Sequence, residues 1–295
     1  MRLIFILSLI IYFSSCSFDN KSGIWMNENQ NLKKKNFPEF ETLVSSKEIF
    51  KEIILHKKNF NFKRLDNKRN LNWSDIFYNK SNNNENLAYE NKNNLLFKSK
   101  KLTRSKVKKF FLFNKGNLIL SDIKGNLIVF SLKDNKEKVK FNFYKKKFKK
   151  FDKNLNILAN NDYIYVSDNL GFLYAYNYEE NKIIWAKNYK IPFRSNLKIS
   201  DDKLIGADQS NNLYFFDLYS GEIIKKIPTE ETVLKNKFVN NLSANADKIF
   251  YLNTYGTLYA LDIETAKINW FLNLNQSEDI NPSNLFLSNQ IVNNG

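Results

Sequence analysis

The sequence has few of the side chains on which catalysis and covalent cross-linking depend. Its 295 residues include one cysteine, so no disulfide can form within the chain and packing alone must hold the fold. The only histidine, His56, has no second histidine and no cysteine pair to complete a metal site, and a Ser-His-Asp triad would need this same residue. The eight glycines form no phosphate-binding loop. We therefore expect a protein that is not an enzyme, with no catalytic, cofactor-binding or metal-binding residues.

A long apolar run is missing from the N-terminus. The run "LIFILSLIIYF" at residues 3–13 is too short for a bilayer core, which needs about 20 residues. With Arg2 before it and two serines after it, the run has the three-part form of an export signal. Cys16 follows directly, and this order resembles a bacterial lipobox. The resemblance implies a lipoprotein signal peptide at residues 1–15, a lipid on Cys16 and sorting to the outer membrane. An ordinary signal peptide with a chance cysteine is the alternative.

Aromatic and apolar residues are plentiful, and they are arranged in a repeat. The stretch "SDNLGFLYAYNYEENKIIW", residues 167–185, predicts two turns on either side of a strand. The leucine after the first turn recurs at positions 127, 173, 213 and 258, in steps of 46, 40 and 45 residues. These steps match the length of a four-stranded propeller blade. The run "LYAY" at residues 173–176 does not alternate with polar residues, so we expect both of its faces to be covered.

The turn residues keep the same phase as the apolar runs. Three aspartates are expected to form turns by bonding their own backbone, rather than to act as paired acids: Asp122, Asp168 and Asp208. Asn211 stands where the other three copies have glycine in the first turn, and Ala266 stands where the third copy has Gly221 in the second turn. Asparagine adopts the left-handed conformation more readily than alanine does.

The copy "YGTLYALDIETAKINW" resembles the PQQ-like propeller repeat, and the match covers residues 114–271. The resemblance implies an all-β fold, a β-propeller of four-stranded antiparallel blades. Trp185 and Trp270 end two of the copies, whereas Val139 and Lys225 stand at this position in the others. We expect the blades without this tryptophan to dock more loosely on their neighbours.

The resemblance also implies a ring of seven or eight blades, of which residues 101–295 would form an incomplete, C-terminally truncated part. A small closed ring that uses residues 95–105 as an extra strand is the alternative. Residues 16–100 are expected to form a lipid tether and an N-terminal segment. Within it, residues 40–60 have helical spacing and would either dock a partner or cap the propeller, and the Asn-rich residues 79–94 are not expected to pack.

The formal charge of +16 raises the question of a polyanionic partner. The basic runs "KLTRSKVKK" at residues 101–109 and "YKKKFKK" at residues 144–150 would suit nucleic acid in a cytoplasmic protein. The export signal argues against that partner. Attraction to anionic lipid or to acidic protein surfaces stays open, and solvated lysines on outer strands and loops are the simpler explanation.

A lipoprotein signal, a polar tether and a propeller without cofactor residues together resemble the BamB family, the accessory lipoproteins of the outer-membrane β-barrel assembly machine. In that family an interblade loop with an apolar-x-apolar-Arg motif docks the periplasmic domains of the barrel-forming subunit. "KIPFRSN" places Ile191, Phe193 and Arg194 in this pattern. The alternative is that Phe193 packs between blades and Arg194 is solvated. The family's acidic pair in the next blade falls near residues 237–241, "KFVNN", which are not acidic, and Asn240 and Asn241 are the candidate residues there.

The resemblance therefore implies partner binding by these five residues and a lipid-anchored periplasmic scaffold that assists the insertion of outer-membrane proteins. Its implied partners are the barrel-forming subunit and the membrane, with no nucleic acid. A quinone-dependent dehydrogenase shares the repeat and is one alternative, although the adjacent cysteine pair that such enzymes are expected to show is absent. Another propeller-type binding module of the cell envelope is the second alternative.

Overall fold

The computed structural model describes residues 66–69, 72–84, 86–92, 94–95, 98–144, 146–230, 240–274 and 290–294. The chain divides into two compact units, Met1–Lys57 and Lys58–Gly295, and every described residue belongs to the second. Cys16, His56 and the helix predicted at residues 40–60 lie outside the described residues. Within the described part, no helix has the length and apolar character needed to cross a membrane.

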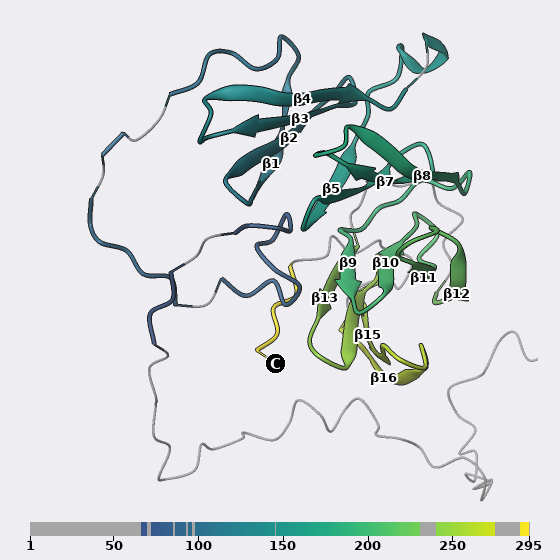
Figure 1. Cartoon of the computed structure of the whole chain (residues 1–295). Helices are drawn as coiled ribbons and strands as arrows, with labels where there is room; N and C mark the ends of the chain where they lie inside the picture. The colour runs from purple at the N-terminus through teal and green to yellow at the C-terminus, as the bar shows by residue number, and fades with distance from the viewer. Residues whose placement is uncertain are drawn as a thin grey trace, which may run out of the picture. The chain divides into compact units, whose positions relative to one another are not determined.

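The described residues form sixteen strands in four antiparallel sheets of four, and each sheet follows sequence order (Figure 1). Blade 1 consists of β1 (Val107–Asn114), β2 (Asn117–Asp122), β3 (Asn126–Ser131) and β4 (Lys136–Asn142). After the short 3₁₀ turn η1 (Lys146–Phe148), blade 2 consists of β5 (Leu155–Asn160), β6 (Tyr163–Asp168), β7 (Phe172–Asn177) and β8 (Lys182–Asn188). Blade 3 consists of β9 (Lys198–Ser200), β10 (Lys203–Ala207), β11 (Leu213–Asp217) and β12 (Ile223–Ile227). Blade 4 consists of β13 (Asn241–Ala244), β14 (Lys248–Leu252), β15 (Thr257–Asp262) and β16 (Ile268–Asn273).

This arrangement confirms the predicted all-β fold and the four-stranded antiparallel blades. The described residues between 95 and 105 belong to no strand, so the extra strand of the alternative closed ring is not found there.

The turn between the second and third strands is built in the same way in every blade. One side-chain oxygen of its first residue accepts the N–H groups two and four residues later, at 2.8–3.0 Å. The residues that supply this oxygen are Asp122, Asp168, Asp208 and Asn253. The fourth residue of each turn is left-handed: Gly125, Gly171, Asn211 and Gly256. The three predicted turn aspartates are confirmed, and Asn253 is a fourth member that the sequence pattern did not identify.

The turn between the third and fourth strands also repeats. A left-handed residue precedes the fourth strand in each blade: Asn135, Asn181, Gly221 and Ala266. The register then shifts at the same place in all four blades, which gives each fourth strand a β-bulge. Ala266 holds the glycine position with a φ of 51°, at a conformational cost of about 1–2 kcal/mol.

Apolar side chains of neighbouring blades form three clusters, one at each junction between consecutive blades. The third strands of blades 2 and 3, β7 and β11, lie between two such clusters. Along β7, Tyr174 and Tyr176 face the cluster shared with blade 1, whereas Leu173 and Ala175 face the cluster shared with blade 3. The expectation that this run is covered on both faces is therefore confirmed.

Residues 72–83, which we call the inner segment, lie along the first strands of all four blades (Figure 1). It forms backbone hydrogen bonds with β1, from Trp73 N to Phe113 O (2.6 Å), and with β5, from Ala159 N to Ser74 O (2.8 Å). Its contact with β9 is a side-chain bond from Lys198 Nζ to Asp75 Oδ2 (2.7 Å). Its contact with β13 is a backbone bond from Ala244 N to Lys80 O (2.8 Å). The inner segment thus joins blades that are distant in sequence.

Part of the Asn-rich stretch packs, contrary to expectation. Asn82 is 1% exposed, and its amide donates to the carbonyl of Leu242 in β13 at 2.8 Å. Asparagine side chains can replace water as partners of buried backbone groups. The expectation was therefore wrong for Asn82, whose side chain is a hydrogen-bond partner of buried backbone.

Candidate functional site

The loop that carries the predicted partner-binding motif, residues 189–197, connects β8 to β9, and we call it the interblade loop. Its backbone is bonded to three blades. The bonds run from Tyr189 N to Gly171 O (2.8 Å), Phe193 N to Asp168 O (3.0 Å), Arg194 N to Ala207 O (3.0 Å) and Asn240 N to Arg194 O (2.8 Å). Backbone bonds to rigid strands therefore determine the path of this loop.

The loop also fits closely against the β6–β7 turn of blade 2. A Cβ atom at Gly171 would lie 2.8 Å from the backbone nitrogen of Ile191, which is shorter than a van der Waals contact. The glycine has a φ of 89° as well, so it serves both the turn and the approach of the loop.

The ring of Phe193 lies inside the protein, at 3% exposure. It makes edge-to-face contacts with Tyr189 at 6.1 Å and Phe216 at 6.0 Å between ring centroids. Phe193 is thus a core residue at the junction of blades 2 and 3. Its ring is not on the surface in this conformation. The burial of Phe193 fits the alternative that it packs between blades, and it does not fit the predicted role as an exposed anchor.

Ile191 and Arg194 keep part of their surface exposed. Partial burial lowers the pKa of the Arg194 guanidinium, yet arginine stays protonated at neutral pH. A guanidinium can donate to a carboxylate, or to backbone carbonyls, through two N–H groups at once. These two side chains are the members of the predicted set that a partner can touch directly.

The two predicted asparagines are buried at the start of blade 4, Asn240 at 0% and Asn241 at 4% exposure. The Asn240 amide donates to the Tyr251 hydroxyl at 3.0 Å and to the Asp208 carbonyl at 3.2 Å. Asn241 pairs with Leu252 in the β13–β14 ladder. The structure therefore brings Asn240 and Arg194 together through the backbone, and Asn240 joins the start of blade 4 to blade 3.

Asn196 is a positioning residue that the sequence pattern did not reveal. Its amide donates to the carbonyl of Leu242 at 2.9 Å, and its oxygen accepts the Leu242 N–H at 2.9 Å. The side chain thereby continues the β-ladder of blade 4 across to blade 3. The signal for such a residue would be an asparagine just before a first strand, but many loop asparagines share that position.

The buried ion pair between Asp75 and Lys198 is the second unpredicted feature. Their side chains are 2% and 0% exposed, and the Lys198 ammonium also donates to the Asn79 carbonyl at 2.9 Å and to Asn82 Oδ1. Burial raises the pKa of Asp75 and lowers that of Lys198, while their mutual attraction opposes both shifts. Removing one partner would leave a buried charge alone, which typically costs about 3–5 kcal/mol.

Acidic side chains do not converge in the part of the chain that the structure describes. There, no group of three or more His, Cys, Asp or Glu residues could hold a metal ion. The turn aspartates lie in separate blades, and their oxygens already accept the bonds of the turns.

Four consecutive four-stranded antiparallel blades define this protein as a β-propeller. Among solved structures, the chain is similar to BamB from Moraxella catarrhalis, with a TM-score of 0.46 and 17% identity over 56% of this chain and 48% of that one. The match thus spans about half the length of the BamB chain. The computationally designed protein Ika4 is also similar, with a TM-score of 0.44 and 8% identity over 55% of this chain and 93% of that one. No protein-family model matches the sequence, and no curated protein matches it either.

Proposed function

We propose that this protein is a non-enzymatic scaffold on the periplasmic face of the outer membrane, anchored by a lipid on Cys16. It binds the periplasmic domains of the barrel-forming subunit of the β-barrel assembly machine and assists the insertion of outer-membrane proteins. The N-terminal stretch before Cys16, which has the form of an export signal, and the propeller repeat support this proposal.

The observation that carries the proposal is the interblade loop. Its backbone bonds to three blades hold it in one shape before a partner arrives, and such preorganisation lowers the entropic cost of binding. Ile191 supplies apolar contact, and Arg194 supplies a forked donor for carboxylates or strand-edge carbonyls. Phe193, Asn240 and Asn241 contribute from inside, because they hold the loop and the start of blade 4 in place.

The test is affinity capture of the full chain from detergent-solubilised membranes of the cells that make it. We expect Arg194→Glu to lower recovery of the barrel-forming subunit at least tenfold, because the charge reversal removes the donor and repels carboxylates. Lys182→Glu, at the exposed start of β8, makes the same change of charge away from the loop and should leave recovery unchanged.

Full recovery of the subunit with Arg194→Glu would overturn the role of the loop. Capture of the unchanged chain without any barrel-assembly subunit would overturn the proposed function itself. Mass spectrometry of the captured protein also tests the anchor, since a peptide that begins with unmodified Cys16 would contradict lipidation.

A further inference from the structure

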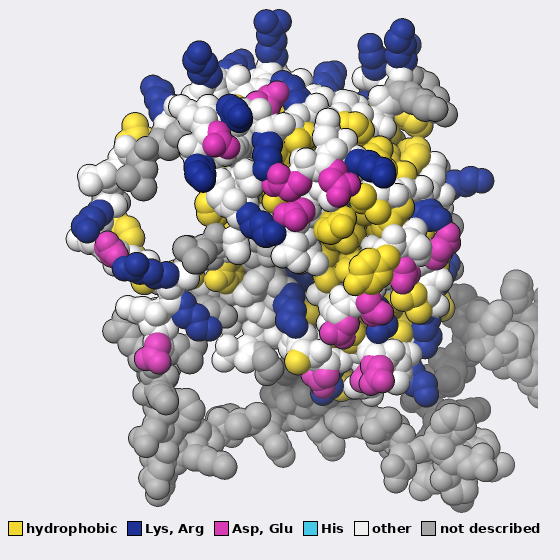
Figure 2. Space-filling view, in the orientation of Figure 1, with side chains coloured by type: hydrophobic (Ala, Val, Ile, Leu, Met, Phe, Trp, Pro, Cys, Tyr) yellow, Lys and Arg dark blue, Asp and Glu magenta, His cyan; other side chains and the backbone are white. Residues whose placement is uncertain are grey.

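Positive charge is concentrated in one region of the chain. Residues 98–154, which contain blade 1 and the connection to blade 2, carry 19 Lys and Arg against 4 Asp and Glu. Residues 155–230, which contain blades 2 and 3, carry 8 against 10. Figure 2 shows lysine and arginine side chains projecting from the part of the surface where Figure 1 places β1–β4. So strong an asymmetry indicates an anionic partner for this region.

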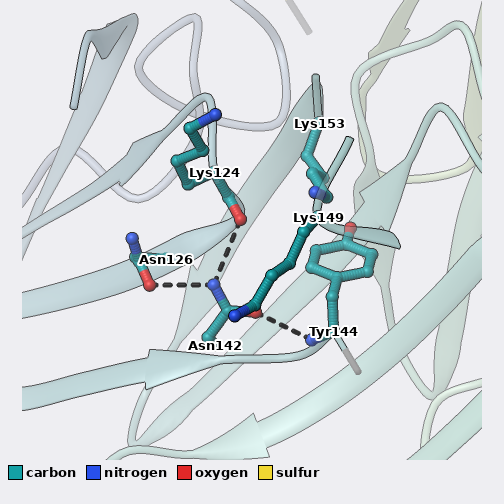
Figure 3. Close-up of a pocket in the computed structure, with 6 residues that line it drawn as sticks. All are labelled: Lys124, Asn126, Asn142, Tyr144, Lys149 and Lys153. Atoms are coloured by element: carbon teal, nitrogen blue, oxygen red, sulfur yellow. Dashed lines mark hydrogen bonds between the residues drawn. The ribbon is translucent and has the colours of Figure 1, made fainter. Parts of the chain in front are cut away.

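Part of this charge surrounds a cavity of about 360 Å³, which we call the basic pocket (Figure 3). It lies where the β2–β3 turn meets the connection from β4 to β5. Its lining residues are Lys124, Asn126, Asn142, Tyr144, Lys149 and Lys153. The Asn142 amide donates to Asn126 Oδ1 at 2.8 Å and to the Lys124 carbonyl at 3.1 Å, and the Tyr144 hydroxyl donates to Asp168. Because these bonds occupy the Asn142 amide and the Tyr144 hydroxyl, the lysine ammonium groups are the donors that remain for a ligand.

Lys153 is a buried cation in this wall, at 1% exposure. Its ammonium donates to the Phe148 carbonyl and lies 5.3 Å from the centre of the Tyr144 ring. Burial lowers the pKa of Lys153, the charge of Lys124 lowers it further, and nearby carboxylates offset this only in part. No described carboxylate forms an ion pair with any of the three pocket lysines. The negative charge of an anion in the pocket would favour the charged form of Lys153 and so offset both effects.

Exposed phenylalanines accompany these charges. Phe151, which follows two lysines in sequence, is 56% exposed, and Phe110 and Phe111 on β1 are 40% and 59% exposed. Lysines interleaved with exposed rings suit the headgroup level of a membrane, where ammonium groups meet phosphates and rings enter the interface. Nucleic acid would also attract the lysines, but the export signal favours a lipid surface.

We propose that the basic pocket and its rim bind the phosphate groups of an anionic lipid surface. The pocket contributes Lys124, Lys149 and Lys153. The rim consists of three exposed residues of the connection from β4 to β5: Lys146, Lys150 and Phe151. The lysines neutralise headgroup phosphates, and Phe151 enters the interface beside them. This inference goes beyond the scaffold role, since it requires neither a lipid on Cys16 nor a protein partner.

The test is co-sedimentation of the full chain with vesicles of phosphatidylglycerol and phosphatidylcholine, compared with vesicles of phosphatidylcholine alone. We expect the double variant Lys124→Gln, Lys149→Gln to bind the anionic vesicles on the order of 25-fold more weakly, because each lysine near such a surface contributes roughly fivefold. The matched control is Lys133→Gln, Lys136→Gln. It removes the same charge from two exposed positions, in the β3–β4 turn and at the start of β4, which lie at the opposite end of β3, and should weaken binding less than about twofold.

Equal losses in the two double variants would assign binding to net charge and overturn the proposal. Equal binding to both kinds of vesicle would assign it to the apolar run at residues 3–13, with the same consequence. Tighter binding to an RNA oligonucleotide, lost in the pocket variant, would reassign the surface to nucleic acid. Binding of inorganic phosphate without any binding of anionic vesicles would reassign the pocket to a free ion.

Discussion

Trp185 and Trp270 occupy equivalent places in blades 2 and 4, but their surroundings differ. Each lies opposite an alanine of the third strand, Ala175 or Ala260, beside the β-bulge. Trp185 is 8% exposed, whereas Trp270 is 45% exposed. Since residue type and register are the same, the neighbouring blade must make the difference. The repeat places a tryptophan at this position, and contact with the next blade buries it.

The contacts of the two tryptophans show how this happens. The Trp185 indole donates to the carbonyl of Leu218 in blade 3 at 3.1 Å, and a Cβ atom at Gly221 would lie 2.6 Å from its ring. Both tryptophans also contact a ring on the second strand of their own blade, Tyr165 for Trp185 and Phe250 for Trp270, each with 6.2 Å between ring centroids. The junction of blades 2 and 3 thus encloses its tryptophan on both sides.

The other two copies use the same position differently. Val139 is 6% exposed within the cluster between blades 1 and 2. Lys225 donates to the Thr265 carbonyl of blade 4 at 3.1 Å. Each of these residues touches the next blade with fewer atoms than an indole does. Looser docking of their blades therefore stays a prediction.

The largest effect should come from removing the enclosed tryptophan. Trp185→Ala should lower the free energy of unfolding by about 3–5 kcal/mol, because a buried indole is lost and a cavity remains. Urea denaturation followed by circular dichroism measures the loss. Trp185→Phe is the control that keeps most of the packing. A loss no greater than that of Trp270→Ala would break the comparison.

The stability of the protein should be almost as sensitive to a substitution of Gly221, the residue against which the Trp185 ring packs. Gly221→Ala should lower the free energy of unfolding by about 2–4 kcal/mol, because φ is 71° and the new Cβ would collide with the Trp185 ring. Ala266 already holds an alanine at the equivalent place in blade 4. Ala266→Gly should change stability by less than about 1 kcal/mol, since relief of strain offsets a lost buried methyl group. Equal effects at the two sites would contradict this account.

Alkaline pH should act on the same junction. Burial raises the pKa of Tyr165 and of Tyr189, each to about 12. An unfolded chain ionises these groups near pH 10. Their contribution is therefore complete below about pH 10 and is lost as the pH rises towards 12. Urea midpoints measured across this range should fall, and the double variant Tyr165→Phe, Tyr189→Phe should flatten the decline. An unchanged slope in that variant would place the sensitivity elsewhere.

The smallest effect should come from the exposed tryptophan of blade 4. Trp270→Ala should lower the free energy of unfolding by less than about 1 kcal/mol, because nearly half of this side chain is already in water. The same urea titration measures it. A loss of about 3 kcal/mol or more would show that Trp270 is enclosed in solution.

The blades could be predicted because their signals are local. A turn needs an aspartate and a left-handed residue three positions apart, and both lie in one short stretch of sequence. Asn253 escaped notice because the pattern was expected to start with an acid, although an amide oxygen accepts the same two bonds. Allowing asparagine at that position would have identified all four turns.

Local signals could predict neither the contacts of the inner segment nor which side chains of the interblade-loop motif are buried. Asp75 and Lys198 are 123 residues apart, and nothing in either neighbourhood points to the other. The tripeptide around Phe193 has the same sequence whether its ring is exposed or buried, because the aromatic residues that enclose it come from β11 and the start of the loop. Ile191 and Arg194 lie in a loop between two blades, as their pattern predicted, but their exposure depends on the fold.

The inner segment has a consequence for how the protein unfolds. Repeat units that touch only their neighbours can come apart one at a time, starting from either end. Here one short stretch is bonded to β1, β5, β9 and β13, so loss of any single blade also weakens the hold on the other three. Four units with mainly local contacts are thereby coupled into one cooperative transition.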